Sequence, residues 1–168
     1  MIPVLTTDRL TLRALKARDL APYTAYYTGD RTGGVGGPLP AHKVFERFCA
    51  MIGHWQVRGF GRFGICLDPG APAIGHVGPM QLDDGAPEMT WTLWAAKHEG
   101  KGIATEAARA VLTHLFGAGW SRLLAHVEPD NARSHAVARR LGGTPTGADA
   151  PSWAPLSTQY QFTPEALT

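Results

Sequence analysis

The segment Glu99-Gly100-Lys101-Gly102-Ile103-Ala104-Thr105 has the residue types and spacing of an anion-binding turn. Glycines let a backbone turn sharply with its N–H groups pointing inward. The apolar residues that follow recur at helical spacing, and the N-terminus of a helix adds about half a positive charge. We expect these N–H groups to hold a phosphate or a diphosphate. The alternative is a helix start that only needs flexible residues.

Three better-known motifs do not fit this segment. A nucleotide-binding P-loop requires Ser or Thr after Gly-Lys, but Gly102 follows Lys101. A dinucleotide-binding fingerprint needs a third glycine where Thr105 stands and a parallel βαβ unit near the amino terminus. A zinc-protease motif that began at His98 would need a second histidine at position 102. The histidines are scattered, so we expect no metal site.

Hydrophobic periodicity predicts the elements that position this turn. Leu10, Leu12 and Ala14 alternate with polar residues, as in a strand with one buried face and one face in solvent. Asp19 is expected to cap the helix that follows this strand, and residues 29–37 are expected to form a flexible loop. Helices are predicted over 20–27, 41–58, 104–116 and from Asn131 to Gly142, and further strands over 63–67, 73–82, 88–94, 123–127 and 159–162.

Composition indicates an ordinary globular protein. The chain has 168 residues, the size of one domain, with 44% hydrophobic and 18% charged residues. Its net charge of +2 is too small to predict a nucleic-acid partner. The first five residues contain no basic leader, so we expect neither a secretory signal nor a membrane span, and a cytoplasmic location. Cys49 and Cys66 lack disulfide or zinc spacing and are expected to be core thiols.

Residues 100–107 resemble the acetyl-CoA loop of the GNAT N-acetyltransferases. The motif of that family is Gln or Arg, two residues, Gly, one residue, then Gly or Ala; here Glu99 holds the Gln or Arg position. Residues 7–13 look like the opening strand of the family. The Asn131-Ala132-Arg133-Ser134 segment is similar to the Asn-x-x-Ser segment of its RimJ/RimL branch, which acetylates protein amino termini and some small amines.

The resemblance implies a fold and a co-substrate. The fold is an α/β (α+β) GNAT fold, a single domain over 1–168 with about four helices. Its mixed, mostly antiparallel sheet has about six or seven strands and is splayed between the fourth and fifth strands, which are 88–94 and 123–127 here. Acetyl-CoA is the expected co-substrate, and no metal is implied.

The resemblance also assigns roles by position. Leu93 and Trp94 would offer backbone hydrogen bonds to pantetheine and to the thioester carbonyl. Lys101 and Arg133 could assist at the diphosphate, or could be ordinary surface residues. Asn131 is counted with the cofactor-binding residues, although its main expected task is to cap a helix. The N–H groups expected to hold the diphosphate are those of Gly100, Lys101, Gly102, Ile103, Ala104 and Thr105.

The implied reaction is direct attack of a neutral amine on acetyl-CoA. Glu88 is the first candidate to accept the amine proton, because related enzymes often carry an acid where this strand begins; His76 and His126 are alternatives. Ser134 is the candidate to protonate the leaving thiolate, because the tyrosine that many GNAT enzymes use is Ala138 here. Each of these residues could instead be structural.

These roles predict an acetyl-CoA-dependent N-acetyltransferase acting on a peptide amino terminus or a small amine. Two alternatives stay open: a small-molecule or antibiotic-detoxifying acetyltransferase, and a CoA-binding module without catalysis, which Glu99 and Ala138 suggest. The expected partners are acetyl-CoA and an amine acceptor, without nucleic acid or membrane, and the chain is expected to be able to form a homodimer.

Overall fold

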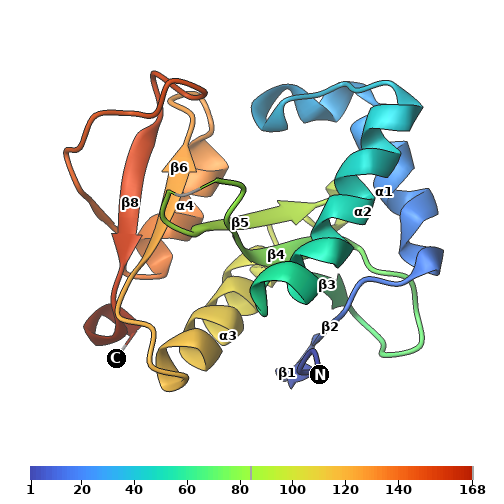
Figure 1. Cartoon of the computed structure of the whole chain (residues 1–168), viewed down its shortest axis with the longest axis horizontal. Helices are drawn as coiled ribbons and strands as arrows, with labels where there is room; N and C mark the ends of the chain where they lie inside the picture. Colours follow the sequence, from blue (N-terminus) through green and yellow to red (C-terminus); the bar gives the residue numbers. More distant parts are fainter. Residues whose placement is uncertain (84, 168) are drawn as a thin grey trace.

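A mixed sheet forms the centre of the protein, with helices on both of its faces (Figure 1). The structure is a computed structural model that describes residues 1–83 and 85–167. Within these residues the sheet has eight strands in the order β1-β2-β3-β4-β5-β6-β8-β7. They are β1 (Leu5–Thr6), β2 (Thr11–Arg13), β3 (Phe63–Cys66), β4 (Gly75–Met80), β5 (Glu88–Leu93), β6 (Leu123–Val127), β7 (Thr144–Pro145) and β8 (Thr158–Phe162).

The sheet separates the core into two layers, and a pair of helices covers each layer. Helices α1 and α2 pack on one face of the sheet through a cluster that includes Tyr23, Val44 and Phe48. Helices α3 and α4 cover the other face through a larger cluster around Val111 and Leu141. The helices are α1 (Leu20–Tyr27), α2 (Ala41–Arg58), α3 (Ile103–Gly117) and α4 (Ala132–Arg140), with 3-10 turns η1 (Ala17–Asp19), η2 (Asp30–Val35), η3 (Ala96–His98) and η4 (Pro164–Leu167).

The fold expected from the resemblance is confirmed. Adjacent strands pair antiparallel except β5 and β6, whose parallel pairing is confined to Glu88 opposite Leu124. Beyond that pair the two strands diverge, so the splay lies where it was expected (Figure 1). The sheet exceeds the expected six or seven strands because β1 and β7, of two residues each, add to it. The expected loop over 29–37 contains the 3-10 turn η2.

Strand β2 lacks the solvent-exposed face that its alternating sequence predicts. Both of its faces are buried, and Arg13 is only 4% exposed. The Arg13 guanidinium donates to both carboxylate oxygens of Asp19, at 2.8 and 3.0 Å. Asp19 is fully buried and also accepts the N–H groups of Lys16 and Ala73. The expectation that its side chain caps α1 is therefore wrong: the carboxylate ties β2 to the β3–β4 connection.

We expect Asp19→Asn to lower the free energy of unfolding by about 3 kcal/mol, because it leaves the buried Arg13 charge without its counter-ion. Burial raises the pKa of Asp19, but hydrogen bonds from Arg13, Ala73 and Lys16 outweigh it and hold the pKa below its ordinary value. A lowered pKa stabilises the fold above the ordinary pKa, and this contribution is lost as the pH falls through the folded-state value. Urea denaturation from pH 7 down to pH 3 measures both effects.

Asp68→Asn is the matched control for this prediction. Asp68 lies in an exposed turn, where its Oδ1 atom accepts the Gly70 N–H, and asparagine keeps that acceptor. Its unfolding free energy should stay within about 0.5 kcal/mol of the parent protein. If both variants lost the same unfolding free energy, the buried ion pair would not make the proposed contribution to stability.

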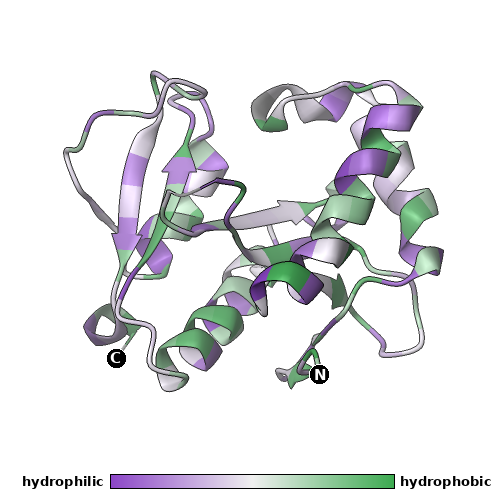
Figure 2. Ribbon diagram, viewed as in Figure 1, coloured by the Kyte–Doolittle hydropathy of each residue, from purple (hydrophilic) through white to green (hydrophobic). Residues whose placement is uncertain are grey.

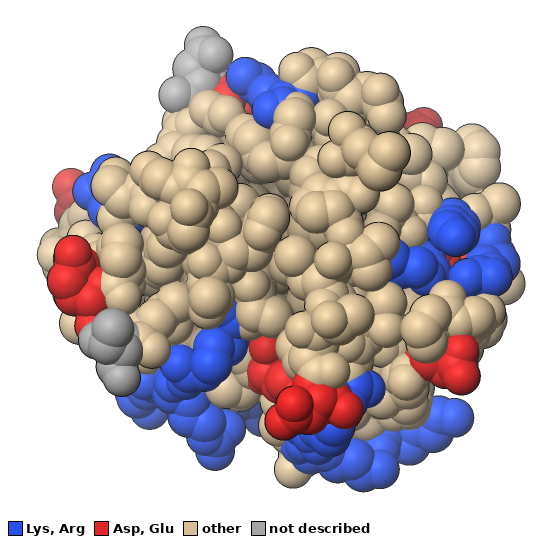
Figure 3. Space-filling model, turned by 90° about the horizontal axis from the view of Figure 1, so that it is seen from below, with Lys and Arg blue, Asp and Glu red and all other residues tan. Residues whose placement is uncertain are grey.

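The surface carries both signs of charge. On the face seen in Figure 3, basic and acidic side chains lie around the rim, with uncharged residues between them. Cys66 is buried as expected, but Cys49 is exposed, so only one of the two cysteines is a core thiol. In the described part of the chain, none of the helices has the length and apolar character needed to cross a membrane.

Candidate active site

The register of β4 against β5 determines which backbone groups face the gap between β5 and β6. The Trp94 N–H donates to the Ile74 carbonyl at 2.8 Å, so alternate residues of β5 bond to β4. Pro79 has no N–H to donate, and it lies opposite Met89 at a position where β4 and β5 exchange no backbone hydrogen bonds. The backbone groups of Trp91 and Leu93 therefore point toward the gap. This orientation is compatible with the expected role of Leu93, whereas the Trp94 N–H is already bonded to the Ile74 carbonyl. Trp91, which was not among the expected residues, has the same orientation as Leu93.

The glycine turn leads directly into α3. Gly100 and Gly102 have φ values of 71° and 74°, the left-handed region that side chains disfavour. Helix α3 begins at Ile103, and the first N–H groups of a helix have no partner within it. The turn thus places unpaired backbone donors at the positive end of the α3 dipole. This is the geometry expected of an anion site.

An ion pair from the amino-terminal segment fastens the turn. Arg9 donates to the Lys101 carbonyl at 3.0 Å and to Glu106 Oε2 at 2.7 Å. Thr7 donates to the other carboxylate oxygen of Glu106. Burial opposes ionisation of Glu106, but these hydrogen bonds from Thr7 and Arg9 outweigh it and lower the pKa of Glu106. The segment over residues 7–13 therefore holds the first turn of α3 in position.

Glu99, the acid at the Gln or Arg position of the motif, is paired with two arginines. Its carboxylate contacts the guanidinium groups of Arg31 in η2 and Arg133 in α4. Arg31 also donates to the Trp94 carbonyl at 3.3 Å. Arg133 is 82% exposed, so it lies at the surface beside the turn. The negative charge of Glu99 is thus compensated, and it does not stand alone beside the anion site.

Ser134 lies at the start of α4 and contacts β5. The Asn131 side chain accepts the Ser134 N–H at 3.0 Å, which confirms Asn131 as the cap of α4. Trp91 Nε1 donates to Ser134 Oγ at 3.3 Å. Because the hydroxyl oxygen accepts this hydrogen bond, its own proton is left to donate elsewhere. The sequence identified Ser134, but the contact with Trp91 is a finding of the structure.

Glu88 and His126 come together at the start of the gap. His126 Nδ1 lies 3.1 Å from Glu88 Oε2, a close contact without hydrogen-bond alignment, and this buried nitrogen has no other partner among the described residues. His126 Nε2 lies 3.0 Å from the Gln159 amide nitrogen, and Thr146 donates to the Gln159 oxygen at 2.9 Å. This order of donors assigns the imidazole proton to Nδ1, facing Glu88. Glu88 is 29% exposed, so it can reach solvent.

A polar sheet surface extends from this pair. Glu88, Thr90 and Thr92 alternate with core residues on β5, so they share one face with His126 on β6. Figure 2 shows hydrophilic bands on the neighbouring strand β8. The Trp153 ring stands edge-on to His126, with 5.2 Å between centroids. These side chains form a half-buried polar floor beside α1 and α2, where an acceptor could lie.

His76, the other candidate base, is a structural residue. It is 1% exposed and accepts a hydrogen bond from Trp94 Nε1 at 3.1 Å. Burial, together with the nearby charges of Arg62 and Arg47, holds the pKa of His76 well below its ordinary value. A neutral imidazole buried among aromatic rings cannot exchange a proton with a substrate, so Glu88 and His126 remain the candidates.

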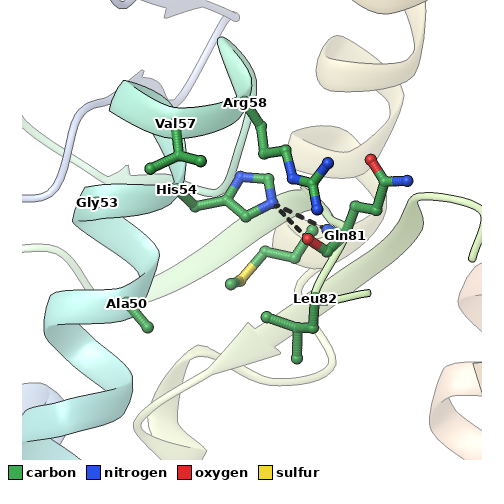
Figure 4. A pocket seen from close by; sticks show the side chains of 8 residues that line it. Ala50, Gly53, His54, Val57, Arg58, Gln81 and Leu82 are labelled. Carbon is green, nitrogen blue, oxygen red and sulfur yellow. Dashed lines mark hydrogen bonds between the residues drawn. The ribbon is translucent and has the colours of Figure 1, made fainter. Parts of the chain in front are cut away.

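A separate pocket of about 370 Å³ lies between α2 and the end of β4 (Figure 4). His54 lies in its wall, with Nδ1 2.6 Å from the Phe60 carbonyl and Nε2 accepting the Gln81 N–H at 2.9 Å. Both ring nitrogens are therefore occupied by backbone groups. This histidine ties α2 to β4, and we assign it no chemical role.

Sequence reasoning missed three contributors to the site. Arg31 is 68 residues from Glu99, and Gln159 is 33 residues from His126, so no local sequence pattern predicts either contact. Trp91 could have been found from the sequence, because alternation along β5 gives its backbone groups the same direction as those of Leu93. That direction is known only once the hydrogen-bonded pairs with β4 are known.

Comparisons with known proteins agree with this geometry. Residues 9–144 match the family model described as the acetyltransferase (GNAT) domain. A crystal structure of the acetyltransferase from Agrobacterium tumefaciens str. C58 is 35% identical, with a TM-score of 0.88, over 96% of this chain and 95% of that one. No curated protein sequence matches the chain.

Two more distant structures share the fold and contain coenzyme A or acetyl-CoA. RimL, the ribosomal L7/L12 α-N-protein acetyltransferase, was solved with coenzyme A and has a TM-score of 0.78 at 19% identity, over 98% of this chain and 99% of that one. The microcin C7 self-immunity acetyltransferase MccE, solved with acetyl-CoA and AMP, has a TM-score of 0.76 at 18% identity, over 94% and 93%. With the family model covering most of its length, the chain belongs to the GNAT family of acetyltransferases.

Proposed function

We propose that this protein transfers the acetyl group of acetyl-CoA to a primary amine, on a peptide or protein amino terminus or on a small molecule. The observation that carries the proposal is the gap between β5 and β6, because the backbone groups of Trp91 and Leu93 face it. One end of this gap meets the donor-rich turn before α3, and the other meets Glu88 and His126.

In this proposal the turn before α3 binds the diphosphate of acetyl-CoA. The donors are the N–H groups of the turn and of the first helical turn, with the Lys101 and Arg133 side chains at the rim. Leu93 and Trp91 would hold the pantetheine arm and the thioester carbonyl through their backbone groups. The donor N–H groups are those of Gly100, Lys101, Gly102, Ile103, Ala104 and Thr105.

The chemical step forms a C–N bond to the acetyl carbon and breaks its C–S bond. The neutral amine loses one proton to Glu88, directly or through a water molecule, while the His126 ring lies against one carboxylate oxygen of Glu88. The departing sulfur gains a proton from Ser134, whose hydroxyl the Trp91 indole orients. Ser134 then regains a proton from water and Glu88 releases the one it accepted, so both side chains return to their starting state. The products are an amide and CoA, so no other reactant is needed.

We expect Ser134→Ala to lower kcat about 30-fold and Trp91→Phe about fivefold, since each removes part of a general-acid contribution. Phenylalanine keeps the aromatic packing against Phe162 but cannot donate to Ser134. The readout is steady-state release of free thiol. If Trp91 acts through Ser134, adding Trp91→Phe to the Ser134→Ala variant should cause no further loss. Additive losses in the double variant would show that Trp91 acts independently of Ser134.

The relatives support two acceptor classes. RimL is an α-N-protein acetyltransferase of ribosomal L7/L12, and MccE is a self-immunity acetyltransferase for microcin C7. A peptide amino terminus is our first choice for this chain, and a small toxic amine is the second. A cytoplasmic location and the capacity to form a homodimer stay predictions from the sequence.

A panel of amines tests the function. The protein is mixed with acetyl-CoA and with peptides or small amines, and free thiol is followed while mass spectrometry detects the acetylated product. Product from at least one amine supports the proposal. Thermal stabilisation by CoA without thiol release from any amine would instead support a binding module without catalysis.

A further inference from the structure

Arg62, which precedes β3, lies on the sheet face where the acceptor is proposed to bind. The strand registers place it opposite Gly78 on β4, and Gly78 opposite Thr90 on β5. Gly78 has a φ of 135°, and a Cβ atom there would stand 2.6 Å from the Gly61 carbonyl oxygen. Glycine at position 78 therefore lets the Gly61–Arg62 backbone pack directly against β4, which places Arg62 beside this strand.

The Arg62 guanidinium forms no ion pair with a carboxylate in the described part of the chain. Its Nε atom is fully buried without a hydrogen-bond partner, and no acceptor among residues 1–83 and 85–167 pairs with its other nitrogens. Burial lowers the pKa of Arg62, although arginine stays charged at neutral pH. The buried Arg13, in contrast, is paired with Asp19. Arg62 is half-buried, and a partly desolvated charge without a partner is costly, so its site is complementary to an anion that the described residues do not supply.

A second guanidinium reinforces this positive potential. Arg47 on α2 lies over the Tyr27 ring, 4.9 Å from its centroid, and donates to the Val35 carbonyl at 3.4 Å. Arg47 and Arg62 both act electrostatically on Tyr27, whose burial raises its pKa and keeps it neutral. Glu88 also acts electrostatically on Arg62, but its carboxylate lies against His126 and forms no ion pair with Arg62. Two like charges therefore act on a common region in which no described carboxylate pairs with Arg62.

The distances suit an acceptor that carries both charges. Neighbouring strands are about 4.8 Å apart and successive residues of a strand about 3.4 Å, so the Cα atoms of Arg62 and Glu88, two strands and two residues apart, are about 12 Å apart. Both side chains rise from the same face of the sheet. An acceptor with its amine at Glu88 and its anionic group several bonds away can therefore reach Arg62.

We propose that Arg62, assisted by Arg47, binds a carboxylate or phosphate group of the acceptor, a few bonds from the amine that is acetylated. This inference rests on the proposed function and narrows its substrate class to amines with a nearby anion. Acidic amino-terminal peptides and phosphorylated small amines both satisfy it.

Matched acceptor pairs test the proposal by thiol release at saturating acetyl-CoA. The dipeptide amides Ala-Glu and Ala-Gln differ in one carboxylate, and phosphoethanolamine and ethanolamine differ in one phosphate. We expect the charged member of at least one pair to have a kcat/KM at least about tenfold higher, as for a charge-assisted hydrogen bond. The pair that shows the preference identifies a carboxylate or a phosphate as the group bound.

Two arginine variants test whether Arg62 is the source of the preference for the charged acceptor. In Arg62→Gln the ratio within the preferred pair should fall to about one, whereas Arg58→Gln, an exposed arginine on α2, should keep it. A ratio that Arg62→Gln leaves unchanged, or equal rates for both members in the parent protein, would overturn the proposal.

A thermal measurement is independent of turnover. With CoA saturating its own site, millimolar inorganic phosphate should raise the Tm of the parent protein by about 1–3 °C but not that of Arg62→Gln. Equal shifts in both proteins would count against the subsite. Failure of every amine to react would overturn the proposed function, whereas this phosphate shift would still report on Arg62.

Discussion

Replacing Gly102 with aspartate is expected to weaken acetyl-CoA binding about a thousandfold. Gly102 has a φ of 74°, and aspartate is among the few residues that tolerate this conformation. Its carboxylate would take the N–H groups at the start of α3 and repel the diphosphate. At an effective dielectric constant of about 20, one unit charge 4 Å away costs about 4 kcal/mol. Isothermal titration with acetyl-CoA measures the loss.

Gly119→Asp is the control for this variant. Gly119 follows the other end of α3, also has a positive φ of 93°, and has open space where a Cβ would stand. Both substitutions carry the same backbone strain, but only the first adds charge at the anion site. If the Gly119 variant binds acetyl-CoA as weakly as the Gly102 variant, strain in α3 explains the loss and the turn is not the diphosphate site.

Glu88→Gln is expected to lower kcat/KM at pH 7 about a thousandfold for a lysine-like amine. Such an amine has a pKa near 10.4, so about one molecule in 2,500 is neutral at pH 7 without help. For an α-amino group, with a pKa near 8, about one in ten is already neutral, and the loss should be smaller. The rate deficit should shrink as the pH rises toward the pKa of the amine, and a pH–rate profile measures this.

Asp83→Asn serves as the matched control, because Asp83 is an exposed acid in the same β4–β5 connection. Its Oδ1 atom accepts the Gly85 N–H, which asparagine preserves. The control should keep the parent profile within about twofold. A deficit in Glu88→Gln that is equal at every pH would show that Glu88 positions the substrate rather than accepting its proton.

The pairing of Glu99 explains how an acid can occupy the Gln or Arg position of the acetyl-CoA motif. Arg31 and Arg133 contact its carboxylate from two different elements, η2 and α4. The positive charge that an arginine at this motif position would supply is thus present beside the turn, on Arg133. The motif departure that suggested a binding module without catalysis is therefore compensated in three dimensions.

Local patterns in the sequence were enough to predict most elements of the fold. Helix α2 and strand β6 have the predicted limits, and Asn131 caps α4 as expected. The glycine turn was recognisable because Gly100 and Gly102 immediately precede a strongly periodic helix. Periodicity, caps and tight turns are properties of neighbouring residues, so one segment contains all the information they need.

Tertiary structure alone decided which groups meet at the site. The use of the Trp94 amide by Ile74, and hence the exposure of Trp91 and Leu93 to the gap, depends on strand register. The half-buried position of Arg62, without an ion-pair partner among the described residues, also depends on contacts between distant segments. The chain sequence determined the kinds of chemical group available and their local conformation. Their partners came from packing, because register and long-range contacts minimise unpaired polar groups over the whole molecule.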